Sequence, residues 1–274
     1  MRRPKYVPPS AQQNRKQARL AVVYSALAIA LLGAVLILYS WLDRPRIDPL
    51  GCPDTPLPAI TAILVDVTDS YTPVQREFIL GQLTQYLEKT QKFEKVYLFV
   101  VDTNSLGTLD PVSQRCNPGT GADENPVTGN PRLSQKRWRK LYLDPLQAAL
   151  TASVARPPES ESPIMEWIQA ISVRAYKVPL QAGGRKRLII VSDLLHHTAE
   201  YSHYRAQAPS FAAFRKSPVY QRLWTDLSDV HVQVFYLRRP NAMGIQGREH
   251  ITEFWEPYFR TLGAVLDEVV RVPG

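Results

Sequence analysis

Three stretches that are far apart in the sequence each bring side-chain oxygen atoms to the end of an apolar run or to the start of a helix. They contain Asp66, Thr68 and Ser70, then Ser160 and Ser162, and finally Ser192 and Asp193. Carboxylates and hydroxyls are hard ligands that suit Mg²⁺, Mn²⁺ or Ca²⁺. The three stretches could therefore supply ligands for a divalent cation, provided that the fold brings them together.

Alternating strand and helix patterns connect these stretches. Short apolar runs predict strands at 60–67, 95–102, 187–193, 230–237 and 269–272. Helical patterns lie at 72–90, 134–155, 163–176 and 251–264. The first of these helices opens with a capping-box spacing, Thr72 followed by Gln75. Strands that are almost continuously apolar and alternate with helices predict an α/β, Rossmann-like fold, with a mostly parallel central sheet covered by helices on both faces. Ligands bind such sheets beyond the carboxyl ends of the strands, where the strand order reverses.

The spacing of the oxygen-bearing residues resembles the metal-ion-dependent adhesion site (MIDAS) of the von Willebrand factor A (vWA) superfamily. That site combines a DxSxS motif after the first strand, a hydroxyl residue before a Pro-led helix, and an Asp after the fourth strand. Asp66, Thr68 and Ser70 match the first motif, with Thr in place of the first Ser. Ser162 matches the loop hydroxyl, where the family more often has Thr, and Asp193 matches the last position.

This resemblance covers residues 59–274 and implies a vWA-like domain. It implies that the first and fourth strands are neighbours, so that Asp66 and Asp193 flank one crevice. It further implies a Mg²⁺-type cation, with Mn²⁺ or Ca²⁺ as substitutes, whose open coordination place takes an acidic side chain of a partner protein. The expected function is protein binding without enzymatic activity, and no small-molecule substrate is expected.

Two alternatives remain open at this point. The same residues can form a hydrogen-bonded strand end without a metal, which would leave a metal-free scaffold subunit of a membrane complex. The stretch LVDVTDS also resembles the nucleophile strand of haloacid-dehalogenase-like phosphatases, so a metal-dependent hydrolase is the second alternative. Those enzymes need a second Asp where this chain has Thr68, and no GxSxG, HExxH or Gly-rich phosphate loop is present. The sequence therefore predicts no enzyme.

The segment 194–224 follows Asp193 and is rich in His, Tyr and Arg. It is expected over the carboxyl edge of the sheet, either as a recognition rim around the cation or as a helical cover whose aromatic side chains pack on the sheet. Its three histidines, His196, His197 and His203, have no further ligand at a spacing suited to zinc.

An uncharged apolar segment lies near the N-terminus, at residues 20–41. A helix of this length spans roughly 30 Å, the thickness of a bilayer core. A basic tail, residues 1–19, precedes it, and a Pro-rich stalk, residues 42–58, is expected to lift the domain at 59–274 off the membrane. A retained transmembrane anchor is favoured over a cleaved signal peptide, because the run is long and no small-x-small site follows.

The charge distribution predicts the orientation of this anchor. The tail contains six cations and no acidic residue, which places the N-terminus in the cytosol and the domain outside, in the periplasm if the cell has one. Without those six charges, the net charge of +8 falls to +2 for the rest of the chain, so nucleic acid is not an expected partner.

The chain has two cysteines, Cys52 and Cys116, and the predicted orientation puts both in an oxidising compartment. A disulfide between them would close a long loop. Two unpaired thiols are the alternative, because sequence spacing does not show whether the two Cα atoms approach each other.

Overall fold

The first helix forms a unit of its own. In the computed structural model, which describes residues 10–42, 45–101, 110–125, 127, 129–205 and 209–273, helix α1 runs from Ser10 to Leu42. Within it, the segment Gln17–Tyr39 has a mean hydropathy of 2.6. The most apolar part of this segment is not buried against the rest of the described chain. The helix is therefore long and apolar enough to cross a membrane, as predicted, although a signal sequence near an N-terminus has the same properties.

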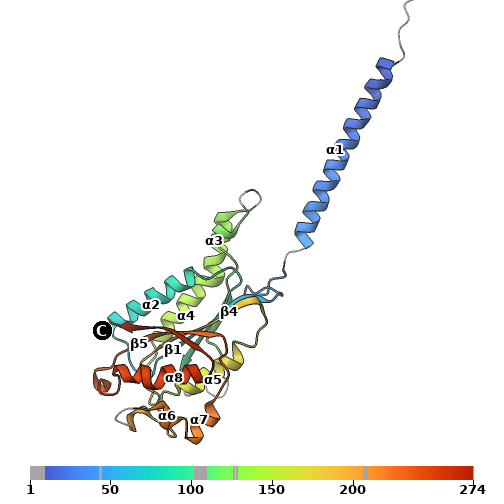
Figure 1. Ribbon diagram of the computed structural model, residues 1–274. Coiled ribbons are helices and arrows are strands. Elements are labelled where there is room, and N and C mark those ends of the chain that lie inside the picture. Colours follow the sequence, from blue (N-terminus) through green and yellow to red (C-terminus); the bar gives the residue numbers. More distant parts are fainter. Residues whose placement is uncertain are drawn as a thin grey trace, which may run out of the picture. The chain divides into compact units, whose positions relative to one another are not determined.

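The second unit, Ile47–Gly274, is built around a six-stranded sheet (Figure 1). The strands are β1 (Leu57–Asp66), β2 (Lys95–Val101), β3 (Ser113–Cys116), β4 (Leu180–Ser192), β5 (Val230–Leu237) and β6 (Val265–Val272). Their order is β3-β2-β1-β4-β5-β6, and β3 alone pairs antiparallel. The predicted α/β class with a mostly parallel sheet is confirmed. Asp102, predicted as the last residue of the second strand, lies outside the described residues.

Helices cover both faces of the sheet and create two apolar cores. The longer ones are α2 (Pro73–Glu88), α3 (Pro131–Trp138), α4 (Asp144–Val154) and α5 (Ile164–Arg174), and the shorter ones are α6 (Phe211–Phe214), α7 (Pro218–Leu223) and α8 (Glu256–Thr261). Strand β1 shows why both faces are apolar, because Ile60 and Leu64 lie in one core whereas Ile63 and Val65 lie in the other. A strand buried on both faces has no polar side, which explains its continuous apolar sequence.

Two local sequence features set the ends and the path of the helices. The predicted capping box at the start of α2 is present, with the Thr72 hydroxyl accepting from the Gln75 amide at 3.2 Å and the Gln75 side chain accepting from the Thr72 amide at 3.2 Å. Helices α3 and α4 are joined by a π-helical turn, Arg139–Leu143. Pro145 is the second residue after this turn and lacks the N–H that an α-helix would use to bond Leu141, which explains the irregular turn.

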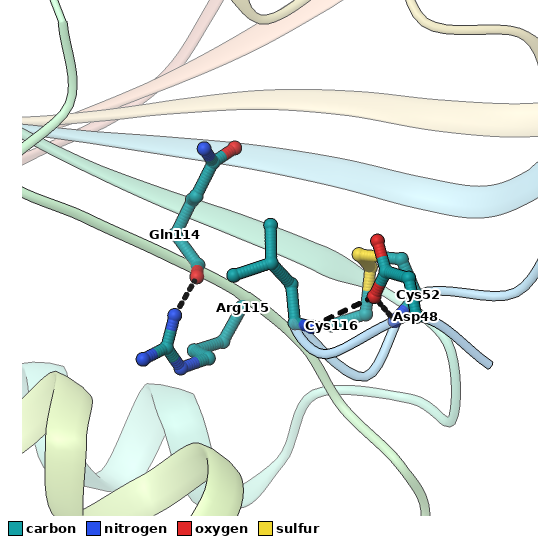
Figure 2. Close-up of a disulfide and its surroundings, with 6 residues drawn as sticks. Asp48, Cys52, Gln114, Arg115 and Cys116 are labelled. Atoms are coloured by element: carbon teal, nitrogen blue, oxygen red, sulfur yellow. Dashed lines mark hydrogen bonds between the residues drawn. A yellow bond between two sulfur atoms is a disulfide. The ribbon is translucent and has the colours of Figure 1, made fainter.

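The chain before β1 is folded against the sheet, unlike the free-standing stalk expected from its prolines (Figure 2). Cys52 and Cys116 form a disulfide with a Cα–Cα distance of 4.8 Å. The Cys116 amide donates to the Leu50 carbonyl at 2.9 Å, and the Asp48 carboxylate accepts from the amides of Leu50 and Cys52 at 2.8 and 2.7 Å. Residues from Ile47 onward therefore belong to the second unit, because a covalent bond and a turn fix them to β3.

Candidate metal centre

The candidate site lies at the carboxyl edge of the sheet, where β1 and β4 end side by side. These strands pair in parallel, with Val65 opposite Val191, so Asp66 and Ser192 reach the same edge. Strand β1 has β2 on its other side, so the strands that follow β1 extend the sheet first through β2 and β3 on one side and then from β4 to β6 on the other. This is the kind of switch point at which open α/β sheets bind ligands.

Asp66 is the buried centre of a hydrogen-bond network that joins the three stretches. Its Oδ1 accepts from the amide and hydroxyl of Thr68, at 3.0 and 2.7 Å. Its Oδ2 accepts from the Ser192 hydroxyl at 2.7 Å and from the Ser162 hydroxyl at 3.3 Å. A hydroxyl that donates its proton to Asp66 keeps its lone pairs for another partner. The network therefore orients oxygen lone pairs of Thr68 and Ser162 away from Asp66, where a cation can use them.

Asp193 brings a second buried carboxylate to this edge. Its Oδ1 accepts from the Leu195 amide at 2.9 Å, and its Oδ2 accepts from Arg239 Nε at 2.9 Å. Burial and the negative charge of Asp66 raise the pKa of Asp193 to about 7, although the guanidinium of Arg239 opposes the shift. A carboxylate with a raised pKa is one whose charge is incompletely compensated, and an additional cation would favour its ionised form.

Arg239 is a cation within the site that sequence reasoning missed. It follows β5, and its side chain is only 8% exposed. Besides its bond to Asp193, its Nη1 donates to the Ser70 carbonyl at 2.8 Å, and its Nε lies 3.4 Å from an Asp69 oxygen. Gln246 fixes the backbone, because its Oε1 accepts from the Arg239 amide at 2.6 Å. No local pattern marks this residue, since its contacts connect positions distant in the sequence.

Thr68, Ser162 and Asp193 line a small open pocket of about 80 Å³ above the network. Its remaining lining residues are Asp69, Glu159, Ser160, Glu161, Leu195, His197 and Tyr204. Four of the five predicted ligands are thus brought together, with Asp66 directly beneath the pocket. Ser70 is the exception, because it is exposed, does not line the pocket, and contributes its carbonyl to Arg239.

The residues at this pocket fit a hard divalent cation. The donor atoms are oxygens, and the volume exceeds the roughly 30 Å³ that one water molecule occupies in the liquid, which leaves space for a partly hydrated ion. Thr68, Ser162 and Asp193 would hold the ion directly, and Asp66 would hold their hydroxyls in place. Within the described residues, no group of three or more His, Cys, Asp or Glu side chains could hold a metal. Besides the carboxylate of Asp193, a cation here would therefore depend on neutral hydroxyls and on water.

The segment after Asp193 lies partly at the pocket and partly in the apolar core. Its described part reaches back to the site, because the backbones of Ser162 and His197 exchange hydrogen bonds of 2.7 and 3.0 Å. His197 and Tyr204 line the pocket. Phe211 and Phe214 instead belong to the apolar core, where they cover one face of the sheet. The segment therefore supplies part of the pocket rim and part of the cover.

Three histidines are buried in the domain, His196 and His203 in this segment and His250 in the chain after β5. His203 Nδ1 is 3.0 Å from His250 Nε2, and His250 Nδ1 is 2.8 Å from the Tyr236 hydroxyl. Burial lowers the pKa of His250 to about 4 and that of His196 to about 3, and burial together with the charge of His250 lowers the pKa of His203. These rings are therefore held in the neutral form, as parts of the core.

Comparison with known proteins adds no relative. No protein-family model matches the chain, and no curated protein matches it at a significant level. The resemblance to vWA domains accordingly remains a prediction from the residues named above.

Proposed function

We propose that this chain is a membrane-anchored protein-binding module of the vWA type, whose pocket at the carboxyl edge holds a Mg²⁺-type cation. The observation that carries the proposal is the convergence of Thr68, Ser162 and Asp193 on one pocket above the buried Asp66. This is the arrangement that the resemblance to a MIDAS implies, and the hydrogen-bond distances support it.

The bound cation would supply positive charge and an open coordination place for an acidic side chain of a partner protein. The protein's own part is to hold the hydroxyls in a fixed direction, which Asp66 does through both of its oxygens. Asp193 would contribute a negatively charged ligand to the cation. The guanidinium of Arg239 balances part of the negative charge of Asp193 and Asp69.

The domain is proposed to lie outside the cytoplasm, with the N-terminus of the chain inside. Helix α1 is long and apolar enough to act as the anchor. The chain enters the second unit at Ile47. Leu50 and Cys52 then contact Cys116, which lies opposite Lys95 at the amino end of β2, whereas the pocket lies at the carboxyl ends of β1 and β4. The chain therefore enters the domain near the edge of the sheet opposite the pocket.

A metal-free scaffold is the second candidate, and one observation favours it. The ion pair between Arg239 and Asp193 already provides a cation at the site. Under this alternative, Asp66 and its hydroxyl partners serve to fix loop positions, and the partner binds another surface.

Calorimetric titration of the full-length chain with Mg²⁺, after treatment with EDTA, tests the proposal. Wild type should bind about one equivalent, and Asp193→Asn should bind at least ten-fold more weakly, because the charged ligand is lost. Asp226→Asn is the matched control, since Asp226 is fully exposed and does not line the pocket.

Affinity capture of partners with and without EDTA extends the test to function. Partner binding that requires Mg²⁺ and intact Asp193 supports the cation site. Unchanged melting temperature and unchanged partners in EDTA would instead select the scaffold.

A further inference from the structure

A group of unpaired cations covers the first turns of the helix that runs from Pro131. They are Arg132, Lys136, Arg137, Arg139 and Lys140, and all five are exposed. The sequence from 131 to 140 contains no acidic residue. Among the residues that the structure describes, none of the five makes an ion pair. Their charges are therefore available to an external partner.

Three of these cations share one side of the helix. Arg132, Lys136 and Arg139 are spaced by four and three residues, which places them in one row. With Gly121 and Ala122 of the neighbouring 3₁₀ turn, they line a shallow open groove of about 600 Å³. Such a row presents several positive charges to one surface, as binding to a field of anionic groups requires.

This cationic row follows, along the chain, the strand to which the entry segment of the domain is bonded. Strand β3 runs antiparallel to β2, so Cys116 lies opposite Lys95, at the amino edge of the sheet. The groove begins five residues after Cys116, and Cys116 is bonded to Cys52. Figure 1 shows α3 projecting from the body of the domain.

The length of the tether restricts what this edge can meet. Helix α1 ends at Leu42, and the second unit begins at Ile47. A chain of five residues spans at most roughly 18 Å. If α1 is a membrane anchor, the amino edge is therefore held near the bilayer surface.

An exposed apolar side chain accompanies the charges. Leu133 is 56% exposed and follows Arg132 directly on the same helix. Basic residues combined with exposed apolar residues are typical of helices that contact the headgroup region of a membrane. A lipid surface explains both features, whereas a purely ionic partner would explain only the charges.

We propose that the cationic row on α3, formed by Arg132, Lys136 and Arg139, binds the anionic headgroups of the membrane in which α1 is anchored. This contact would orient the domain, with the amino edge of the sheet toward the lipid and the pocket at Asp193 away from it. The proposal rests on α1 being a retained anchor and is independent of whether the pocket holds a cation.

The test places a fluorophore on a Leu133→Cys variant of the full-length chain, with the native disulfide intact. The chain is reconstituted in vesicles of phosphatidylcholine alone, or of phosphatidylcholine and phosphatidylglycerol at about 7:3, each with a quencher on the headgroups. We expect at least two-fold stronger quenching in the anionic vesicles. The difference should disappear in about 0.5 M NaCl, because the Debye length then falls to a few ångströms.

Two sets of substitutions separate charge from structure. The triple variant Arg132→Gln, Lys136→Gln, Arg139→Gln should lose the additional quenching, whereas Arg132→Lys with Arg139→Lys should keep it. The control Arg215→Gln, Lys216→Gln, Arg248→Gln removes three exposed cations that do not line this groove and should behave like wild type.

Three results would overturn the proposal. They are equal quenching in the two lipid compositions, an equal loss in the control triple variant, and failure of the wild-type chain to float with the vesicles. The last result would also show that α1 is not a retained anchor, whereas the first two would leave the anchor intact.

Discussion

Replacing Arg239 by Gln removes a cation that contacts Asp193 and tests how the site balances its charges. The side chains of Arg239 and Asp193 are 8% and 3% exposed, and their atoms are 2.9 Å apart. Removing one partner of a buried ion pair typically costs about 3–5 kcal/mol, because the other charge stays buried without compensation. For a domain of this size, a loss of about 3 kcal/mol lowers the melting temperature by roughly 6–12 °C.

The loss of stability should depend on pH. The pKa of Asp193 is raised to about 7 even with Arg239 present, and Arg239 acts to lower it. Without Arg239 the pKa rises further. When the pKa of a carboxyl group is higher in the folded than in the unfolded state, the free energy of unfolding decreases as the pH rises from the unfolded-state pKa through the folded-state pKa. The variant should therefore lose most stability at pH 8. At pH 5, where Asp193 is protonated, the cost should fall to about 1 kcal/mol for lost hydrogen bonds.

Thermal melts at pH 5 and pH 8 measure this difference, with Arg238→Gln as the matched control. Arg238 is the preceding residue and carries the same charge, but it makes no ion pair within the described part of the chain. In the Arg239→Gln variant at pH 8, Mg²⁺ should restore part of the lost stability, because it can take the place of the guanidinium charge. Equal melting temperatures for the two variants at pH 8 would show that Arg239 does not compensate the charge of Asp193.

Two further predictions concern the scaffold around the site. Replacing Cys52 and Cys116 by Ser should lower the free energy of unfolding by about 4 kcal/mol, because the disulfide closes a loop with a sequence separation of 64. Urea unfolding with and without a reductant measures this loss, and equal unfolding midpoints would contradict the prediction. The neutral histidines His196, His203 and His250 should make the domain less stable as pH falls from about 6.5 toward 4, since their folded pKa values lie below the unfolded value. His250→Gln should flatten this decline in urea melts between pH 7 and pH 5, and an unchanged slope would show that His250 does not contribute to it.

The site was predictable in part because parallel strands share an edge. Asp66 and Asp193 each follow an apolar run, and adjacency of the two strands was sufficient to bring them together. The hydroxyls of Thr68 and Ser162 belong to the same prediction, and both bond to Asp66. Ser70 was placed with them by its spacing, but the turn after β1 exposes it.

The sequence by itself determined the apolar helix, the strands buried on both faces and the capping box, because each depends on the periodicity or the chemistry of neighbouring residues. Tertiary structure alone decided that Arg239 pairs with Asp193, that Cys52 reaches Cys116, and that the proline-rich segment folds back onto β3. These contacts connect residues that are distant along the chain, and their formation depends on which loops meet at each edge of the sheet. Local patterns report the preferences of the backbone, whereas the partner of a buried charge is set by the packing of the whole domain.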